Sequence, residues 1–140
     1  ELNVKKVITI ENLTSFHTYN KKDELIIYLG GFHNNLRGEF LLKLYNYNKN
    51  NSFYHWSDID LGGFRIFQNL IAKTKIPFNP YNMNKDILIK YQKYAMKISN
   101  KNYLESLKDL LSNEDYSIFH DVIAYMIENK IRLEQEIIYC

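Results

Sequence analysis

The chain has 140 residues, of which 46% are hydrophobic and 24% charged, as expected for one globular domain with a real core. A net charge of +2 neither requires nor excludes a nucleic-acid partner. The single cysteine, Cys140, excludes an internal disulfide. The sequence contains no run of about 18 apolar residues, the length that a membrane-spanning helix needs. With no visible signal peptide, we expect a cytosolic protein.

In the first half of the chain, short apolar runs typical of buried strands alternate with segments whose apolar residues recur at helical spacing. In chain order these predict a strand at 4–10, a short helix at 14–19, a strand at 24–29, a helix at 34–47, a strand at 53–59, a helix at 64–73 and a short strand at 76–78. Parallel strands need crossovers, and these are usually helical. The alternation therefore predicts an α/β fold, a Toprim-like or Rossmann-like parallel sheet of about four strands with helices on both faces.

The second half is predominantly helical in its pattern. Helices are predicted at 85–98, 103–111 and 115–128, and the last segment, 131–139, fits either a helix or a strand. Without strand partners, these helices should form a C-terminal cap on the sheet. We expect residues 1–140 to be a single domain, and the start at Glu1 rather than methionine suggests the C-terminal part of a longer protein.

Three acidic residues follow strands of this predicted sheet: Glu11 after the first, and Asp58 and Asp60 at the end of the third. In open parallel sheets, ligands bind beyond the carboxyl ends of the strands, where the strand order reverses. If the first and third strands are neighbours, the three carboxylates share one crevice and repel one another, and a divalent cation would relieve that repulsion. All-oxygen ligands favour Mg²⁺ or Mn²⁺.

Gly62-Gly63 follow these acids and admit two interpretations. A tight glycine turn would let the backbone approach a phosphate at the amino end of the next helix. Alternatively, Asp60 simply caps that helix, as acids at strand ends commonly do. The combination of two acids two residues apart, the glycine pair and a third acid on another strand favours the metal site.

At these positions the chain resembles the Toprim domain, the metal-binding module of topoisomerases, primases and several nucleases. That family has a Glu after its first strand and an Asp-x-Asp at a later strand end, which Glu11 and Asp58-Ile59-Asp60 match. A narrower resemblance is to the C-terminal Toprim-like domain of the nuclease subunit of the Wadjet plasmid-defence system, related to the topoisomerase VI A subunit. It is carried by Glu11-Asn12, Asp58-Ile59-Asp60 with Gly63-Phe64, and Arg132-Leu133-Glu134-Gln135-Glu136, and it spans nearly the whole chain.

The resemblance implies a Mg²⁺- or Mn²⁺-dependent endonuclease that cuts double-stranded plasmid DNA in the bacterial cytoplasm. Glu11 would be a metal ligand or general acid/base, and Asp58 and Asp60 metal ligands; Glu134 and Glu136 would complete a second metal site or its surroundings. The implied partners are structural-maintenance-like ATPase and accessory subunits, and a homodimer is compatible with the resemblance. Topoisomerase relatives carry their tyrosine on a winged-helix domain absent here, so hydrolysis is the implied reaction.

Other readings of the sequence stay open or are weaker. Arg65, His33, Gly62 and Gly63 are candidate phosphate contacts, although a surface arginine and a loop histidine are ordinary alternatives. The four histidines lack zinc-ligand spacing. A phosphoacceptor receiver domain would need an acidic pair after the first strand. A non-catalytic scaffold or interaction module on the same fold is the main alternative function.

Overall fold

A four-stranded parallel sheet forms the centre of the structure, a computed structural model that describes residues 4–21, 23–30, 35–47 and 49–138. The strands are β1 (Lys6–Ile10), β2 (Glu24–Tyr28), β3 (Ser52–Trp56) and β4 (Asn79–Pro80). Their order is β2-β1-β3-β4, and every neighbouring pair is parallel. The first and third strands are therefore neighbours, with the second outside the first, as the sequence analysis required.

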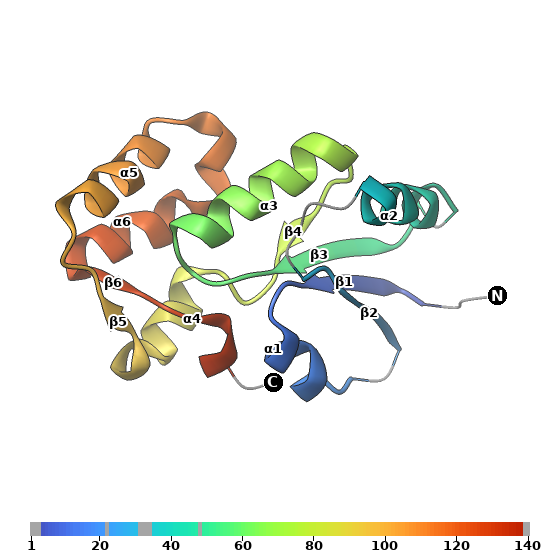
Figure 1. The fold of residues 1–140 in the computed structure, drawn as a ribbon, viewed down its shortest axis with the longest axis horizontal. Coiled ribbons are helices and arrows are strands. Elements are labelled where there is room, and N and C mark those ends of the chain that lie inside the picture. The colour runs from blue at the N-terminus through green and yellow to red at the C-terminus, as the bar shows by residue number, and fades with distance from the viewer. Residues whose placement is uncertain (1–3, 22, 31–34, 48, 139–140) are drawn as a thin grey trace.

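Helices cover both faces of this sheet, which confirms the expected α/β class (Figure 1). Helix α1 (Leu13–Thr18) lies on one face, and α2 (Asn35–Tyr47) and α3 (Leu61–Thr74) lie on the other. Because β1 is central and covered on both sides, Val7, Ile8 and Ile10 have no exposed surface. Helix α1, predicted at 14–19, begins at Leu13 because the Asn12 side chain caps it by accepting from the Ser15 backbone N–H at 3.0 Å.

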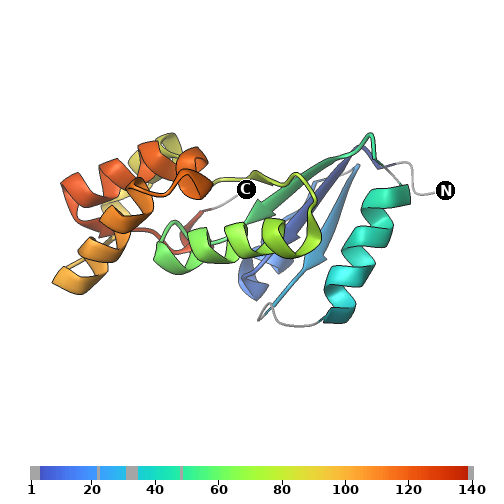
Figure 2. The ribbon, with the colours of Figure 1, turned by 90° about the horizontal axis from the view of Figure 1, so that it is seen from above.

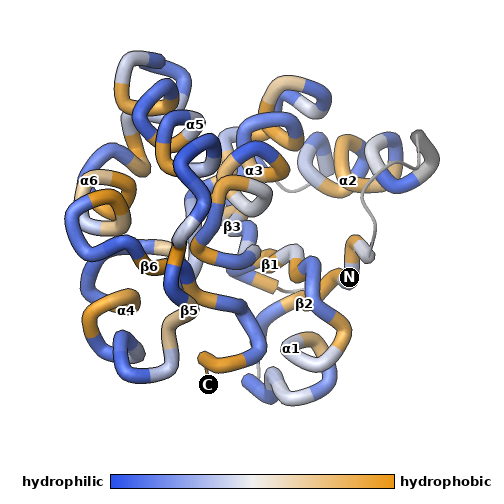
Figure 3. The backbone as a smooth tube through the Cα atoms, turned by 60° about the vertical axis from the view of Figure 1, so that its left-hand side comes forward, coloured by the Kyte–Doolittle hydropathy of each residue, from blue (hydrophilic) through white to orange (hydrophobic). Residues whose placement is uncertain are grey.

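The C-terminal cap consists of α4 (Lys85–Lys90), α5 (Lys101–Leu111) and α6 (His120–Asn129). It lies beyond the carboxyl ends of the strands (Figures 1 and 2). Apolar and polar residues alternate along the tube of α5 and α6, as expected for helices with one buried face (Figure 3). The rings of Phe64 and Phe67 on α3 pack against Phe119, with centroids 4.7 and 5.0 Å apart, so the buried core continues from the sheet into the cap.

The predicted helix at 85–98 is wrong beyond its first half. Helix α4 ends at Lys90, a 3₁₀ turn spans Gln92–Tyr94, and β5 (Met96–Lys97) follows. Strand β5 pairs antiparallel with β6 (Ile131–Arg132), more than 30 residues further along the chain. The backbone of this segment is satisfied by that distant partner, which local periodicity does not reveal.

Several element bounds also differ from those predicted. The fourth strand lies at Asn79–Pro80 rather than 76–78, α5 begins at Lys101, and the predicted helix at 115–128 is a 3₁₀ helix, Glu114–Phe119, followed by α6. The last segment is neither one helix nor one strand: β6 is followed by a 3₁₀ turn at Gln135–Ile137. Among the described residues, no helix is long and apolar enough to span a membrane.

Candidate metal centre

Glu11 stands at the carboxyl end of the central strand β1. Its backbone N–H donates to the carbonyl of Trp56 at 3.2 Å, which extends the β1–β3 pairing by one step and brings Glu11 beside Ser57. The carboxylate is partly buried and hydrogen-bonded to the Ser57 side chain. Burial raises the pKa of Glu11; the Ser57 hydrogen bond opposes that rise, and the negative charge of Asp60 adds to it.

Asp58 lies two residues beyond β3, in the loop that leads to α3. Its Oδ1 accepts from the backbone N–H of Gln135 at 2.5 Å. Burial raises the pKa of Asp58 to about 6; this hydrogen bond opposes the rise, and the negative charges of Asp60, Glu11 and Glu134 add to it. The carboxylates predicted from the sequence therefore act on one another across the edge formed by β1 and β3.

Asp60 is the N-cap of α3, as the capping interpretation proposed. Its Oδ1 accepts from the Gly63 N–H at 2.7 Å, and its Oδ2 lies 3.7 Å from Nη1 of Arg132. Burial raises the pKa of Asp60, while the Gly63 hydrogen bond and the Arg132 charge oppose that rise. One carboxylate thus caps a helix and still contributes charge to the edge where Glu11 and Asp58 lie.

The glycine pair serves packing rather than a separate turn. Helix α3 begins at Leu61, not at Phe64 as predicted, so Gly62 and Gly63 form its first turn. A Cβ at Gly63 would lie 2.0 Å from the carbonyl oxygen of Asp58, an impossible contact. The missing side chain at this position lets the first turn of α3 pack against the loop that carries Asp58.

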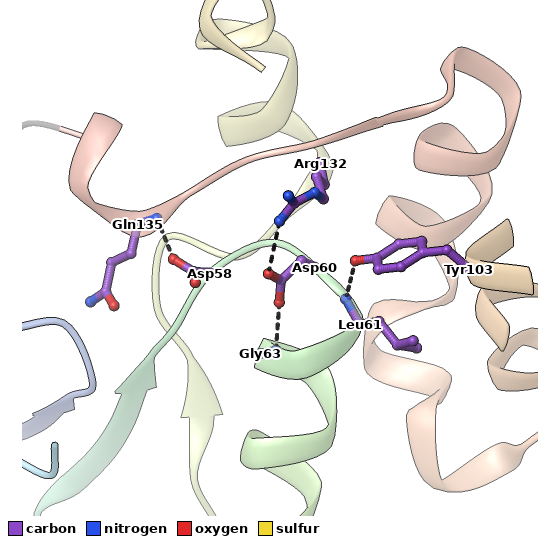
Figure 4. A network of polar contacts seen from close by, with 7 residues as sticks. All are labelled: Asp58, Asp60, Leu61, Gly63, Tyr103, Arg132 and Gln135. Carbon is purple, nitrogen blue, oxygen red and sulfur yellow. Dashed lines mark hydrogen bonds and ion pairs between the residues drawn. The ribbon is translucent and has the colours of Figure 1, made fainter. Parts of the chain in front are cut away.

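A C-terminal strap, residues 132–135, crosses over the acidic loop (Figure 4). Ile59 and Leu133 exchange two backbone hydrogen bonds of 2.9 and 3.0 Å, and Arg132 faces Asp60. The Gln135 backbone holds Asp58, while Gln135 Oε1 accepts from the Asn12 N–H at 3.2 Å. The strap therefore connects the loop after β1 with the loop after β3.

Gln135 was missed by the sequence analysis, which singled out its neighbours Glu134 and Glu136. The side chain of Gln135 is 1% exposed, and alternating exposure along 133–136 is the signal of its role, since Leu133 and Gln135 are buried between more exposed glutamates. Sequence alone does not reveal which of two alternate sets faces inward.

The remaining candidates divide clearly. Glu134 is partly buried and raises the pKa of Asp58 and Asp60 by its charge, whereas Glu136 is exposed. Arg65 is exposed just after the first turn of α3. Arg132 forms an ion pair with Asp60. His33 falls outside the described residues.

A cavity of about 310 Å³ opens beside the acidic edge. Tyr103 joins the two, because its hydroxyl oxygen accepts from the backbone N–H of Leu61, directly after Asp60, at 2.9 Å. The residues that line the cavity are Lys97, Ile98, Ser99, Asn100, Tyr103 and Arg132. Two of these six, Lys97 and Arg132, carry a positive charge, and Arg132 is paired with Asp60.

The acids at this edge offer carboxylate oxygens, the ligand type that hard cations such as Mg²⁺ take. Among the described residues, no three His, Cys, Asp or Glu side chains form a group that could hold an ion by themselves. Mg²⁺ does not require such a cage, because it keeps several waters and is commonly bound by one or two carboxylates. The Nε2 of Gln135 is buried without an acceptor in the described part of the chain, so it is a donor that a coordinated water or a phosphate oxygen would satisfy.

A parallel sheet of order β2-β1-β3-β4, with acids beyond the carboxyl ends of β1 and β3, defines a Rossmann-like domain of the Toprim-like type. The chain belongs to the family described as Wadjet protein JetD, C-terminal, whose model matches residues 1–140. A Wadjet protein JetD from Bacillus cereus (strain Q1) is 35% identical over 138 residues. That match covers 96% of this chain and 34% of the relative, so the chain spans about a third of the relative's length.

Proposed function

We propose that this chain is the catalytic part of a Mg²⁺- or Mn²⁺-dependent endonuclease that cuts double-stranded plasmid DNA in a Wadjet defence complex. The observation that carries the proposal is the position of Glu11, Asp58 and Asp60 beyond the carboxyl ends of β1 and β3, where burial raises the pKa of each and the charge of Asp60 adds to the rise for Glu11 and Asp58. Membership of the Wadjet family supports it. Structural-maintenance-like ATPase and accessory subunits are the proposed partners.

Each carboxylate has a distinct proposed role. Asp58 and Asp60 would hold the ion, which would supply positive charge against the scissile phosphate and make a water easier to deprotonate. Glu11, hydrogen-bonded to Ser57, accepts a proton from the attacking water, whose oxygen bonds to phosphorus as the bond to the leaving oxygen breaks and that oxygen takes a proton from solvent. Glu134 adds negative charge around the ion.

Positive groups beside the acids support a phosphate backbone as the substrate. Arg132 and Lys97 line the cavity next to Asp60, and the exposed side chain of Arg65 lies just after the first turn of α3. Contacts between cations and DNA phosphates position a duplex without reading its sequence. We therefore expect salt to weaken DNA binding, and replacement of these residues by alanine to weaken it to a similar extent for different DNA sequences.

Cleavage of supercoiled plasmid by the full-length protein with its partner subunits tests the endonuclease. With Mn²⁺, Asp58→Asn should lower the rate by about 100-fold or more, because the carboxylate's charge is lost while its shape is kept. Asp109→Asn, an exposed acid on α5, is the matched control and should cleave normally. Normal cleavage by Asp58→Asn would contradict the assignment of the site.

A scaffold without chemistry is the second candidate, because the acids also have structural contacts. Asp60 caps α3 and faces Arg132, and Asp58 binds the Gln135 backbone. Titration calorimetry of the full-length protein with Mn²⁺ separates the two functions. Asp60→Asn preserves a capping oxygen, so a metal centre predicts folded protein with at least about 10-fold weaker binding. Equal Mn²⁺ binding by wild type and Asp60→Asn, or no binding by either, would favour the scaffold.

A further inference from the structure

Three polar side chains are completely buried behind Glu11. Thr9 on β1, and His55 and Ser57 on and just after β3, each have no exposed surface. Thr9 and His55 are register partners in the parallel pair, so their side chains point to the same face of the sheet. Burying three polar groups in a core of aliphatic and aromatic residues is costly unless each finds a hydrogen-bond partner.

These residues form one continuous hydrogen-bonded chain that ends at Glu11. His55 Nδ1 lies 2.7 Å from Thr9 Oγ1, and His55 Nε2 lies 2.5 Å from Ser57 Oγ. The Ser57 side chain is in turn hydrogen-bonded to the Glu11 carboxylate. At its far end, Thr9 Oγ1 also lies 3.3 Å from the carbonyl oxygen of Tyr54, to which it can donate, so its single proton has two possible acceptors, of which His55 Nδ1 is the nearer.

The number of available hydroxyl and ring protons decides which group donates in each of these hydrogen bonds. An ionised Glu11 can only accept, so the single proton of the Ser57 hydroxyl must go to it. The Ser57 oxygen then faces His55 Nε2 with lone pairs, and only an Nε2–H can fill that contact. His55 is neutral, because burial lowers its pKa to about 3, so its Nδ1 carries no proton and accepts from Thr9 at 2.7 Å. The Thr9 proton is then not available to the Tyr54 carbonyl, which is the longer contact at 3.3 Å.

The opposite tautomer lets Thr9 donate to the Tyr54 carbonyl at 3.3 Å, but it moves the unserved contact to Ser57, where His55 Nε2 lies only 2.5 Å away. With the proton on Nδ1, Ser57 has one proton for two acceptors, His55 Nε2 and Glu11. Whichever it serves, the other contact brings two lone pairs together at hydrogen-bonding distance, which costs roughly 1–3 kcal/mol for a buried group. An ionised Glu11 therefore selects the Nε2–H tautomer.

We propose that Thr9, His55 and Ser57 are positioning residues that orient the Glu11 carboxylate, with His55 held as its Nε2–H tautomer. This inference rests on the proposed function only for what Glu11 does afterwards; the orientation itself does not depend on it. The chain directs one Glu11 oxygen toward Ser57 and so determines where its other oxygen points, as partners behind metal-ligating carboxylates commonly do.

Nitrogen NMR of the full-length protein, selectively labelled with ¹⁵N-histidine and without metal at pH 7.5, tests the proposal directly. The His55 ring should show a protonated Nε2 and an unprotonated Nδ1 in about 90% or more of the molecules. In Glu11→Ala, Ser57 is free to donate to Nε2, so more than about half of the population should move to the Nδ1–H tautomer. The signals of the His55 ring are assigned by their loss in His55→Gln or, if that variant does not fold, by their shift in Ser57→Ala.

Asp60→Asn is the matched control, because it removes a nearby charge without touching the chain and should leave the tautomer unchanged. An Nδ1–H tautomer in the wild-type protein, or a tautomer that ignores Glu11→Ala, would overturn the proposal. If plasmid cleavage needs Glu11 but the tautomer fails these tests, Glu11 works without the buried chain. If the tautomer responds as described but no cleavage occurs, the chain positions Glu11 and the endonuclease function is wrong.

Discussion

At the scale of single residues, Asp58 is a carboxylate whose environment opposes its own ionisation. Burial is the largest cause, and Asp60, Glu11 and Glu134 reinforce it. A group of this kind is common at functional sites, because a protein retains an unfavourable charge where a ligand compensates it. The four acids together thus store electrostatic repulsion that a bound cation would release.

Stability of the metal-free protein should fall as pH rises through the titration of Asp58. Its pKa is about 6 when folded and near 3.8 when unfolded, so between these values the folded state binds more protons. The contribution of Asp58 to the free energy of unfolding is therefore most favourable below pH 4 and is lost above pH 6. After solvent screening, the loss amounts to about 1–2 kcal/mol. Urea unfolding of Asp58→Asn and wild type at pH 4.5 and 7.5 measures it: the wild type should lose stability relative to the variant at the higher pH.

Mn²⁺ binding should show the opposite pH dependence. The ion requires ionised carboxylates, so affinity should rise between pH 5 and 7, and binding near pH 6 should release a proton. Calorimetry at pH 6 in two buffers of different ionisation enthalpy detects that release. Proton uptake, or an affinity independent of pH across this range, would exclude Asp58 as a ligand.

The two adjacent glycines should respond very differently to substitution. Gly63→Ala places a Cβ 2.0 Å from the Asp58 carbonyl, so the loop must move and stability should fall by about 1–3 kcal/mol. Gly62→Ala meets only Asp60 Oδ1 at 3.4 Å and gains helix propensity, so it should be neutral or stabilising by up to about 1 kcal/mol. Denaturant unfolding of the pair measures this difference, and equal effects would contradict the close approach at Gly63.

At the scale of elements, α3 depends on Asp60 for its amino end. Asp60→Ala removes the acceptor for the Gly63 N–H and should cost about 1 kcal/mol, whereas Asp60→Asn should retain most of that stability. Thermal unfolding in the absence of metal separates this structural contribution from the metal affinity, which both variants should lose. If the two variants unfold at the same temperature, the capping hydrogen bond contributes nothing measurable.

At the scale of the whole molecule, the C-terminal strap joins the helical cap to the sheet. Leu133 is 1% exposed and exchanges backbone hydrogen bonds with Ile59, between the two aspartates. Leu133→Ala should destabilise the protein by about 2–5 kcal/mol, and the Ile59 N–H should exchange faster with solvent. Ile118→Ala, at a side chain 53% exposed, is the control and should cost about 0.5 kcal/mol or less.

The strap also explains why metal affinity should depend on packing far along the sequence. It reaches Asp58 through Gln135 and Asp60 through Arg132, and both contacts come from the segment that Leu133 anchors. Loosening the anchor frees both aspartates, so we expect Leu133→Ala to weaken Mn²⁺ binding without removing any carboxylate. Calorimetry measures it, and unchanged affinity would show that the acids are positioned by β3 and α3 alone.

The amino-acid sequence by itself determined the parallel sheet, the side of the sheet on which Glu11, Asp58 and Asp60 lie, and most of the helices. These follow from short-range patterns: apolar runs bury central strands, and residues after neighbouring parallel strands must emerge at one edge. Short-range patterns did not predict the structure of residues 85–98 correctly, because the segment contains a strand whose partner lies at 131–132.

Only the tertiary structure decided what surrounds the acids. The inward direction of Gln135, the pairing of Arg132 with Asp60, and the burial of His55 between Thr9 and Ser57 all join residues distant in the chain. Such contacts depend on register and on the angle at which whole elements pack, and a shift of one residue would exchange buried and exposed side chains. Local sequence composition does not determine the register or the packing angle. The hydrogen-bonded chain of Thr9, His55 and Ser57 behind Glu11 is therefore visible only in the folded molecule.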